Sequence, residues 1–233
     1  MNELLDKLKS CPLFRNLPEE VLENQILPQG NLVDIPKNTT VIQYQEKVEY
    51  FNVVISGRIH TLHSFEDGSY SICHVLHPGG VTGVDLLWTA SRVAPYFAVA
   101  AVDSTVLQFP ASLLEIQGGL DETWRIQILE QVLALISMDN MRKEYRLSIL
   151  SRKGLRERIL TYLTMQGAKR RTATFTIPFT REEMASFLCV NRSAMCHELS
   201  MMQQEGLITF RKNKFTLCNR EFAGLPDEKV VSI

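Results

Sequence analysis

The sequence predicts an α+β protein in which an antiparallel β domain comes first, a long helix follows, and a domain with a helix-turn-helix ends the chain. Three observations predict this order. Short β-rich runs separated by turn residues occupy residues 31–109, a proline-free stretch with helically spaced apolar residues follows at 111–150, and two short capped helices lie between 180 and 205. Many short strands at close spacing are typical of an antiparallel barrel or sandwich.

The composition is that of a globular protein. Of 233 residues, 45% are hydrophobic and 22% are charged, which excludes disordered, collagen-like and purely coiled-coil chains. The chain has no apolar run long enough for a membrane span, and its start, MNELLDKLKS, lacks the apolar segment of a signal peptide. We therefore expect a cytoplasmic protein without a membrane partner.

The five cysteines are scattered along the chain and are never closer than seven positions apart. Their odd number and their spacing argue against a disulfide framework, a zinc finger or a C-x-x-C cluster site. This usage fits a reducing compartment, and we expect most of the thiols to be buried or unreactive.

The charge is divided unevenly between the two halves of the chain. Residues 1–141 contain 8 Lys/Arg against 17 Asp/Glu, a net charge of −9, whereas residues 142–233 contain 17 against 9, a net charge of +8. The overall charge of −1 hides this contrast. Such a division is typical of two domains, of which the basic one has a polyanion as its candidate partner.

The β-rich part follows two predicted helices and contains one clear hairpin. Residues 3–9 and 18–27 have helical spacing, and Asp67-Gly68 between two alternating runs predicts a hairpin turn. Folding the chain at this turn places His60 opposite His74 or next to it.

The long helix, residues 116–150, carries two apolar stripes. A helix that lies on one sheet needs only one, so we expect the second face to contact the same helix of another subunit. The stripe assigned to this dimer interface contains Trp124, Ile128, Leu135 and Met138, and the other contains Ile126, Leu129, Leu133 and Ile136. A plain core helix of a monomer remains the alternative, since such patterns are weakly specific.

Residues 179–217 contain the most informative motif. Thr180 caps a helix, Glu183 completes its capping box, and Asn191 caps the next helix after a tight turn at Cys189-Val190. The inward faces are apolar, with Met184, Phe187 and Leu188 on the first helix and Ala194, Met195, Leu199 and Met202 on the second. Two short helices joined in this way form a helix-turn-helix.

The outer side of the second helix carries Arg192, Ser193 and His197. In a helix-turn-helix this side enters the DNA major groove, where an arginine can bond both O6 and N7 of guanine. An exposed helix without a ligand is the alternative, but a basic hairpin with Lys212, placed like a wing, and the cluster Lys169-Arg170-Arg171 favour double-stranded DNA. Phosphate contacts that fix the register are expected from Thr180, Arg181 and Asn191.

The whole chain resembles transcription regulators of the Crp/Fnr superfamily. The likeness rests on the segment VVISGRIHTLHSFEDGSYSICHVLHPGGVTG, on the long helix, and on the winged helix-turn-helix that ends in QQEGLI. It implies a jelly-roll-like β-roll sensor domain at 1–115, a dimerisation helix at 116–150 and a winged helix-turn-helix domain at 151–233. It also implies a homodimer on a palindromic DNA site, no enzymatic activity, and RNA polymerase as a further candidate partner.

The predicted recognition helix keeps part of the family pattern. Arg192 matches a base-reading arginine of the cyclic-AMP branch, whereas Ser193 and His197 replace a glutamate and a later arginine. Because serine both donates and accepts hydrogen bonds, the family's usual half-site sequence is not expected here.

The segment that binds the cyclic nucleotide in relatives also departs from the family pattern. The resemblance places Val84 at the position of a glutamate, and Pro95 and Tyr96 at the positions of an arginine and a serine or threonine. A buried cyclic phosphate without a cation is costly, so cyclic AMP is not expected as the effector, although Arg92 leaves a shifted register open. A small apolar or aromatic effector suits the expected lining, which is Ile42, Thr61, Cys73, His74, Leu76, Trp88, Tyr96, Phe97 and Met138.

We expect no cofactor. The N-terminal part offers only Cys11, whereas an iron-sulfur cluster needs several clustered thiolates. His60, His74 and Cys73 keep a haem or metal site open, but no carboxylate completes a ligand set. A DNA-binding regulator without a ligand and a cupin-like enzyme with an added DNA-binding domain also stay open at this point.

Overall fold

The computed structural model describes residues 2–65, 68 and 70–218. The chain forms two compact units, Met1–Asp139 and Asn140–Ile233, and the boundary falls within the long helix α3 (Glu122–Leu150). The expected division instead set this helix, at 116–150, apart from both domains. Within the described part of the chain, no helix is both long enough and apolar enough to cross a membrane.

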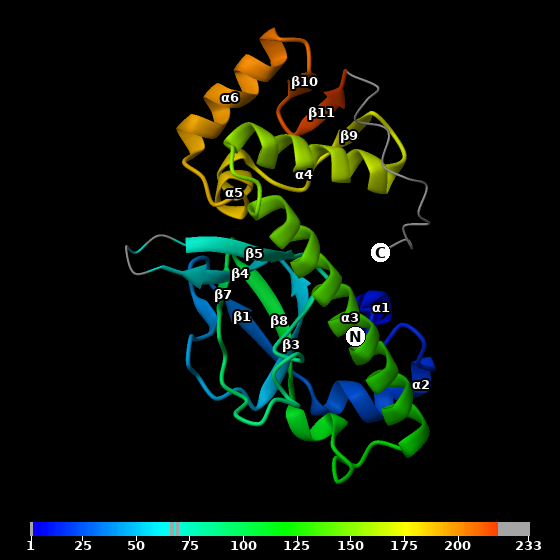
Figure 1. The fold of residues 1–233 in the computed structure, drawn as a ribbon. Coiled ribbons are helices and arrows are strands. Elements are labelled where there is room, and N and C mark those ends of the chain that lie inside the picture. Colours follow the sequence, from blue (N-terminus) through cyan, green and yellow to red (C-terminus); the bar gives the residue numbers. More distant parts are fainter. Residues whose placement is uncertain (1, 66–67, 69, 219–233) are drawn as a thin grey trace. The chain divides into compact units, whose positions relative to one another are not determined.

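The N-terminal unit is built on two four-stranded antiparallel sheets (Figure 1). The first has the strand order β1-β8-β3-β6, and the second has the order β2-β7-β4-β5. The strands are β1 (Asn31–Ile35), β2 (Thr40–Ile42), β3 (Tyr50–Ser56), β4 (Ile59–Ser64), β5 (Tyr70–Leu76), β6 (Val81–Thr82), β7 (Phe97–Ala100) and β8 (Ser104–Pro110). This arrangement confirms the predicted antiparallel β-roll.

Short helices precede the β-roll, as predicted. The first is α1, and the second helical stretch changes its hydrogen-bond pattern along its length. The segments are α1 (Asn2–Ser10), α2 (Glu19–Val21), the π-helical η1 (Leu22–Ile26) and the 3-10 helix η2 (Leu27–Gln29). Pro28 has no N–H with which to continue an α-helix, which explains the irregular end of this stretch.

The central strands β8 and β3 of the sheet β1-β8-β3-β6 are buried on both faces, whereas the edge strand β1 is largely exposed. Phe51 and Val53 of β3 join a cluster with the helices, whereas Val54 joins a cluster with the second sheet. Likewise, Leu107 of β8 belongs to the first cluster and Val106 to the second. Successive side chains of a strand point to opposite faces, so a sheet covered on both sides explains why these segments are continuously apolar.

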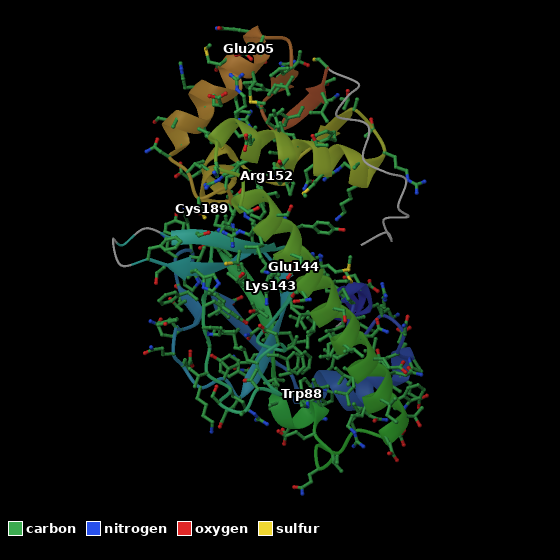
Figure 2. All side chains as sticks on the ribbon, viewed as in Figure 1. Trp88, Lys143, Glu144, Arg152, Cys189 and Glu205 are labelled. Atoms are coloured by element: carbon green, nitrogen blue, oxygen red, sulfur yellow. The ribbon has the colours of Figure 1, made fainter. Side chains whose placement is uncertain are left out.

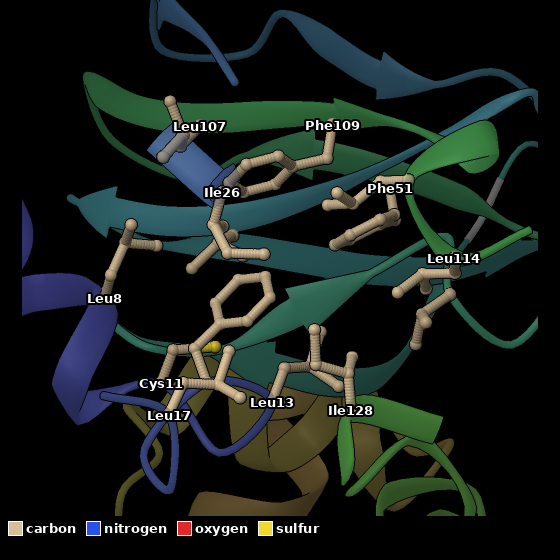
Figure 3. Close-up of a cluster of buried hydrophobic side chains, with 14 of the residues drawn as sticks. Leu8, Cys11, Leu13, Leu17, Ile26, Phe51, Leu107, Phe109, Leu114 and Ile128 are labelled. Carbon is tan, nitrogen blue, oxygen red and sulfur yellow. The ribbon is translucent and has the colours of Figure 1, made fainter. Parts of the chain in front are cut away.

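The larger apolar cluster lies between this sheet and the helices (Figure 3). The Phe109 ring stacks on Phe51 at a centroid distance of 5.3 Å and meets the Phe14 ring edge-on at 5.5 Å. The same cluster contains Cys11, which follows α1, and Ile128, which belongs to α3. Neither residue has any exposed surface. The first half of α3 is therefore part of the core of the N-terminal unit.

The hairpin β4-β5 has the predicted register. Thr61 pairs with His74, and His60 pairs with Val75, which is the neighbour of His74. Asp67, predicted in the turn, lies outside the described residues. Because neighbouring residues of a strand point to opposite faces, His60 and His74 lie on opposite faces of this sheet.

The long helix begins later than predicted, at Glu122 instead of residue 116. Residues Ala111–Leu114 form a separate 3-10 helix, η3, and two glycines follow. A Cβ atom on Gly118 would lie 1.7 Å from the carbonyl oxygen of Ser112, and Gly119 has a φ of +78°. Only glycine suits such backbone, so the chain turns here before the helix starts.

The described part of the C-terminal unit contains the end of α3 from Asn140 onward, three further helices and a three-stranded sheet of order β10-β11-β9 (Figure 1). Helix α4 packs against β9 and β11, α6 packs against β10, and α5 packs against α6. The elements are α4 (Leu155–Arg170), β9 (Thr174–Thr176), α5 (Arg181–Phe187), α6 (Arg192–Gln204), β10 (Ile208–Arg211) and β11 (Lys214–Leu217). The predicted helix-turn-helix and its following hairpin are therefore present.

Candidate nucleic-acid interface

Both helices of the helix-turn-helix begin at the predicted caps. The Thr180 hydroxyl accepts a hydrogen bond from the Glu183 amide at 3.2 Å, and the Glu183 carboxylate accepts one from the Thr180 amide at 2.7 Å. The Asn191 side chain accepts hydrogen bonds from the amides of Ser193 and Ala194 at 2.8 and 3.3 Å. These bonds satisfy N–H groups that a helix start leaves without partners.

Two arginines hold the turn between α5 and α6. Cys189, shown at this turn in Figure 2, has a φ of +53°, which is uncommon for a residue with a side chain. Arg146 donates a hydrogen bond to the Phe187 carbonyl, and Arg158 donates one to the Leu188 carbonyl, both at 3.4 Å. A guanidinium stabilises these carbonyls because the C-terminal end of a helix carries partial negative charge.

Helix α6 has an apolar side and a polar side. The apolar side holds Met195, Leu199 and Met202, which have no exposed surface. The exposed side holds Arg192, Ser193 and His197, together with Ala194, which the sequence analysis placed inward. Arg192 Nε lies 3.5 Å from a carboxylate oxygen of Glu182, and both side chains are exposed. Exposed pairs of this kind are weak, so Arg192 can exchange Glu182 for an external acceptor.

An ion-pair network fixes α6 to α4. The Arg156 guanidinium donates to both carboxylate oxygens of Glu205 at 2.7 and 2.8 Å and to Glu198 at 2.5 Å. Glu205 lies at the C-terminal end of α6 (Figure 2). The hydrogen bonds to Glu205, which has the larger effect, and to Glu198 raise the pKa of Arg156. The planar guanidinium therefore defines the position of α6 at two points about two turns apart.

The hairpin β10-β11 corresponds to the predicted wing. Lys212 in its turn has a φ of +53°. The next residue, Asn213, donates from its side chain to the Ile177 carbonyl at 3.2 Å and accepts from the Ile177 amide at 2.9 Å. Arg181 is half-buried and donates to the Lys212 carbonyl at 2.6 Å. Its guanidinium is thus in contact with the wing, although the sequence analysis expected it to contact phosphate.

The residues expected to line an effector site lie in different surroundings. Ile42, Leu76 and Tyr96 belong to the apolar cluster between the two sheets, and Thr61 is buried. Cys73, His74, Phe97 and Met138 are partly buried. Trp88 is 53% exposed (Figure 2), so it does not line the interior of the β-roll.

A tyrosine hydrogen-bonded to an aspartate occupies the segment that binds the cyclic nucleotide in relatives. The Tyr96 hydroxyl donates a hydrogen bond to Asp85 at 2.8 Å. Burial, and then the Asp85 carboxylate, raise the pKa of Tyr96, so the phenol stays protonated at neutral pH. Arg92, the basic residue nearest to this position in the segment, forms a 3.0 Å ion pair with Glu115. For Arg92 to bind a cyclic phosphate in a shifted register, its ion pair with Glu115 would first have to break.

The histidines of the β-roll do not form a ligand set. His60 and His74 point to opposite faces of their sheet, as their register requires. Across residues 2–65, 68 and 70–218, no group of three or more His, Cys, Asp or Glu side chains is placed to hold a metal ion.

The two stripes of α3 differ in exposure within the N-terminal unit. Ile128 is completely buried by its own chain, and Trp124 and Leu135 pack against the same core. Ile128 therefore has no surface left for a partner subunit, contrary to its assignment to the dimer interface, and Met138 is partly buried. The other stripe is the more open one, with Leu133 66% and Ile126 49% exposed, although its Leu129 also packs against this core.

Sequence reasoning missed several residues at these sites. Arg156 and Arg146 bind partners more than forty positions away, and no local pattern signals such contacts. Asp85 and Glu182 could have been noticed in the sequence. Asp85 is an acidic residue in the segment that corresponds to the nucleotide site, and Glu182 is one in the helix-turn-helix.

Two known domain families match the chain. Residues 32–116 match the cyclic nucleotide-binding domain, and residues 157–222 match the Crp-like helix-turn-helix domain. The transcriptional activator protein FnrL of Cereibacter sphaeroides is 26% identical over 199 residues, which are 81% of this chain and 76% of FnrL. These matches are to transcription regulators and not to enzymes.

Solved structures share the fold. FixK2 from Bradyrhizobium japonicum superposes with a TM-score of 0.61 at 22% identity, covering 82% of this chain and 94% of FixK2. The c-di-GMP responsive regulator CLP from Xanthomonas campestris gives a TM-score of 0.66 at 17% identity, covering 83% and 96% of the two chains. With both domains in this order on one chain, the protein belongs to the Crp/Fnr family of transcription regulators and carries a DNA-binding helix-turn-helix.

Proposed function

We propose that the protein is a homodimeric regulator that binds a palindromic DNA site with one α6 helix in the major groove of each half. The observation that carries this proposal is the exposed side of α6, where Arg192, Ser193 and His197 stand on a helix fixed at its start by Asn191 and along its length by Arg156. Side chains that read bases need such a rigid support, because their hydrogen bonds are directional.

The open stripe of α3 supports the dimer. Ile126, Leu133 and Ile136 are exposed at spacings of seven and three residues, which fit a coiled-coil seam, whereas Leu129 between them packs partly against the chain's own core. Leaving such large apolar side chains in water is unfavourable, and pairing with the same helix of a second copy would bury them. A two-fold dimer in turn requires a two-fold symmetric DNA site.

We further propose that the β-roll binds a small uncharged effector of apolar or aromatic character. The Asp85 carboxylate would repel a cyclic phosphate, and the nearby Arg92 is paired with Glu115. Leu76 and Tyr96, which are partly buried against the apolar cluster between the two sheets, supply apolar and aromatic contacts in the same unit.

Selection from random duplexes tests the DNA part of this proposal. The bound fraction should be enriched in an inverted repeat whose half-sites are centred about 10 base pairs apart. Footprinting should then show protection that is symmetric about the centre of the repeat. Enrichment of a single, asymmetric element would contradict the dimer on a palindrome.

Thermal unfolding with added compounds tests the effector part. Cyclic AMP should leave the unfolding temperature unchanged, whereas a neutral aromatic compound that binds the β-roll should raise it in proportion to the logarithm of its concentration. Titrating the selected DNA with and without that compound should then change the DNA affinity by about 5-fold to 150-fold. A stabilising effect of cyclic AMP would refute the proposed effector class.

A further inference from the structure

Arg181 has an unusual environment for an arginine at the start of a helix-turn-helix. Its guanidinium carbon lies 5.0 Å from the centre of the Phe210 ring and 4.8 Å from that of the Phe215 ring. Phe210 is on β10 and Phe215 is on β11, so Arg181 contacts both strands of the wing. The same guanidinium donates a 2.6 Å hydrogen bond to the carbonyl of Lys212 in the wing turn.

The wing turn needs external support. Lys212 has a φ of +53°, a conformation that is sterically unfavourable for a residue with a Cβ atom. Such backbone persists only where surrounding contacts hold it. Two contacts do so here, since Asn213 is hydrogen-bonded to Ile177 on one side and the Lys212 carbonyl accepts from Arg181 on the other.

Burial makes these contacts of Arg181 strong. Phe215 has no exposed surface, and Arg181 is half-buried against it. A cation over aromatic rings is attracted more strongly when water is excluded, and a hydrogen bond from a charged donor is stronger than a neutral one. A lysine could supply the charge but not the planar group that lies against two rings while donating to a carbonyl.

The structure assigns Arg181 the role of a positioning residue, which holds the wing turn in the conformation that presents Lys212 to the DNA backbone. This inference rests on the proposed function, because it needs the wing to contact DNA. It differs from the expectation that Arg181 itself contacts a phosphate. A phosphate contact depends mainly on charge, whereas the positioning role depends on the shape of the guanidinium and on Lys212.

Limited proteolysis of the free full-length protein tests the structural half of the inference without DNA. Trypsin cleaves after Lys212, and the cleavage rate reports how often the wing turn opens. In Arg181→Lys the rate at this bond should rise about tenfold, because the lost contacts correspond to roughly 1.4 kcal/mol. The control is Arg125→Lys, an arginine of the N-terminal unit that also donates to a carbonyl, that of Ile116. An unchanged rate in Arg181→Lys would overturn the inference.

A double-mutant cycle on the selected DNA duplex tests the functional half. Arg181→Lys should weaken binding about tenfold although the charge is kept, and Lys212→Gln should weaken it by a similar factor. When both changes are combined, Arg181→Lys should cost less than about twofold beyond Lys212→Gln, since the wing contact is already lost. Additive losses would show that Arg181 acts independently of Lys212 and would refute the positioning role.

The two measurements separate the possible failures. If the wild-type protein binds no duplex while Arg181→Lys still accelerates cleavage after Lys212, the proposed function fails and the contact stands. If the wild-type protein binds DNA and Arg181→Lys changes neither affinity nor cleavage, the positioning role fails and the proposed function stands.

Discussion

Single side chains carry the chemistry of this protein, and their surroundings decide which of them are available to a ligand. Arg192 and Arg181 illustrate this, because both are arginines of the helix-turn-helix. Arg192 is exposed and has one weak contact with Glu182, whereas Arg181 is half-buried against the wing. The first is therefore suited to contact bases, and the second is suited to hold structure.

Replacing Arg192 should change sequence preference. Arg192→Ala should lower the affinity for the selected DNA by about 1 to 3 kcal/mol and relax the preference at one base position of each half-site. Lys212→Ala should instead weaken binding to all sequences alike. It should also lower the number of counterions released on DNA binding by about one, which flattens the slope of log affinity against log salt concentration. Binding isotherms on selected and scrambled duplexes at several salt concentrations measure both effects. Equal losses on both duplexes for both variants would contradict the assignment of Arg192 as a base reader.

The buried thiol of Cys11 makes stability depend on pH. Burial raises the pKa of Cys11 from 9.0 to about 12. Between these values the unfolded chain has lost a proton that the folded chain keeps, so the free energy of unfolding falls as pH rises, by up to about 1.4 kcal/mol per pH unit from this group. The effect fades as the pH falls below 9, because the unfolded thiol then keeps its proton as well.

Urea unfolding at pH 8 and pH 10 measures this dependence. Cys11→Ala is expected to be less stable at pH 8 because it leaves a small cavity, but its free energy of unfolding should fall less between the two pH values. The difference between the two proteins isolates Cys11 from lysines and tyrosines that titrate in the same range. Identical falls in both proteins would show that the thiol is not protected from ionisation.

Helices and hairpins are positioned by their ends and by a few long side chains. Helix α6 begins at the Asn191 cap, is held along its length by Arg156, and faces the core with three residues that have no exposed surface. The α5-α6 turn is held by Arg146 and Arg158. The recognition surface thus depends on residues that do not belong to it.

The Asn191 cap can be tested separately from DNA contact. Asn191→Ala should cost about 1 kcal/mol of stability, because two amides at the start of α6 lose their acceptor. Asn191→Asp keeps the acceptor and should keep the stability, but its negative charge should weaken DNA binding. Thermal unfolding and DNA titration of both variants give the two readouts. Undiminished DNA affinity in Asn191→Asp would place this helix start away from the phosphates.

The assembly of the regulator depends on which face of α3 remains open. Its inner stripe fills the core of the N-terminal unit, so the outer stripe is available to a second copy. In the proposed dimer, α3 is the candidate element for passing a signal from the β-roll to the helix-turn-helix units, because it belongs to both compact units of the chain.

Charge on the outer stripe should prevent the dimer. Leu133→Glu should yield a folded monomer, since like charges would face each other across the seam, and its affinity for the palindromic site should fall to that of a single half-site. Ile116→Glu is the matched control, because Ile116 is 84% exposed and lies outside α3. Sedimentation velocity distinguishes the two states. A dimeric Leu133→Glu protein would show that the copies meet elsewhere.

Local patterns in the sequence were enough to predict the β-roll strands, the register of β4-β5, the caps at Thr180 and Asn191, and the two sides of α6 except for Ala194. Each depends on residues close together in the chain, where periodicity and capping act directly. Only the tertiary structure showed that Ile128 faces its own core and that Arg181 contacts the wing. These outcomes depend on packing between segments far apart in the chain, which no local pattern encodes.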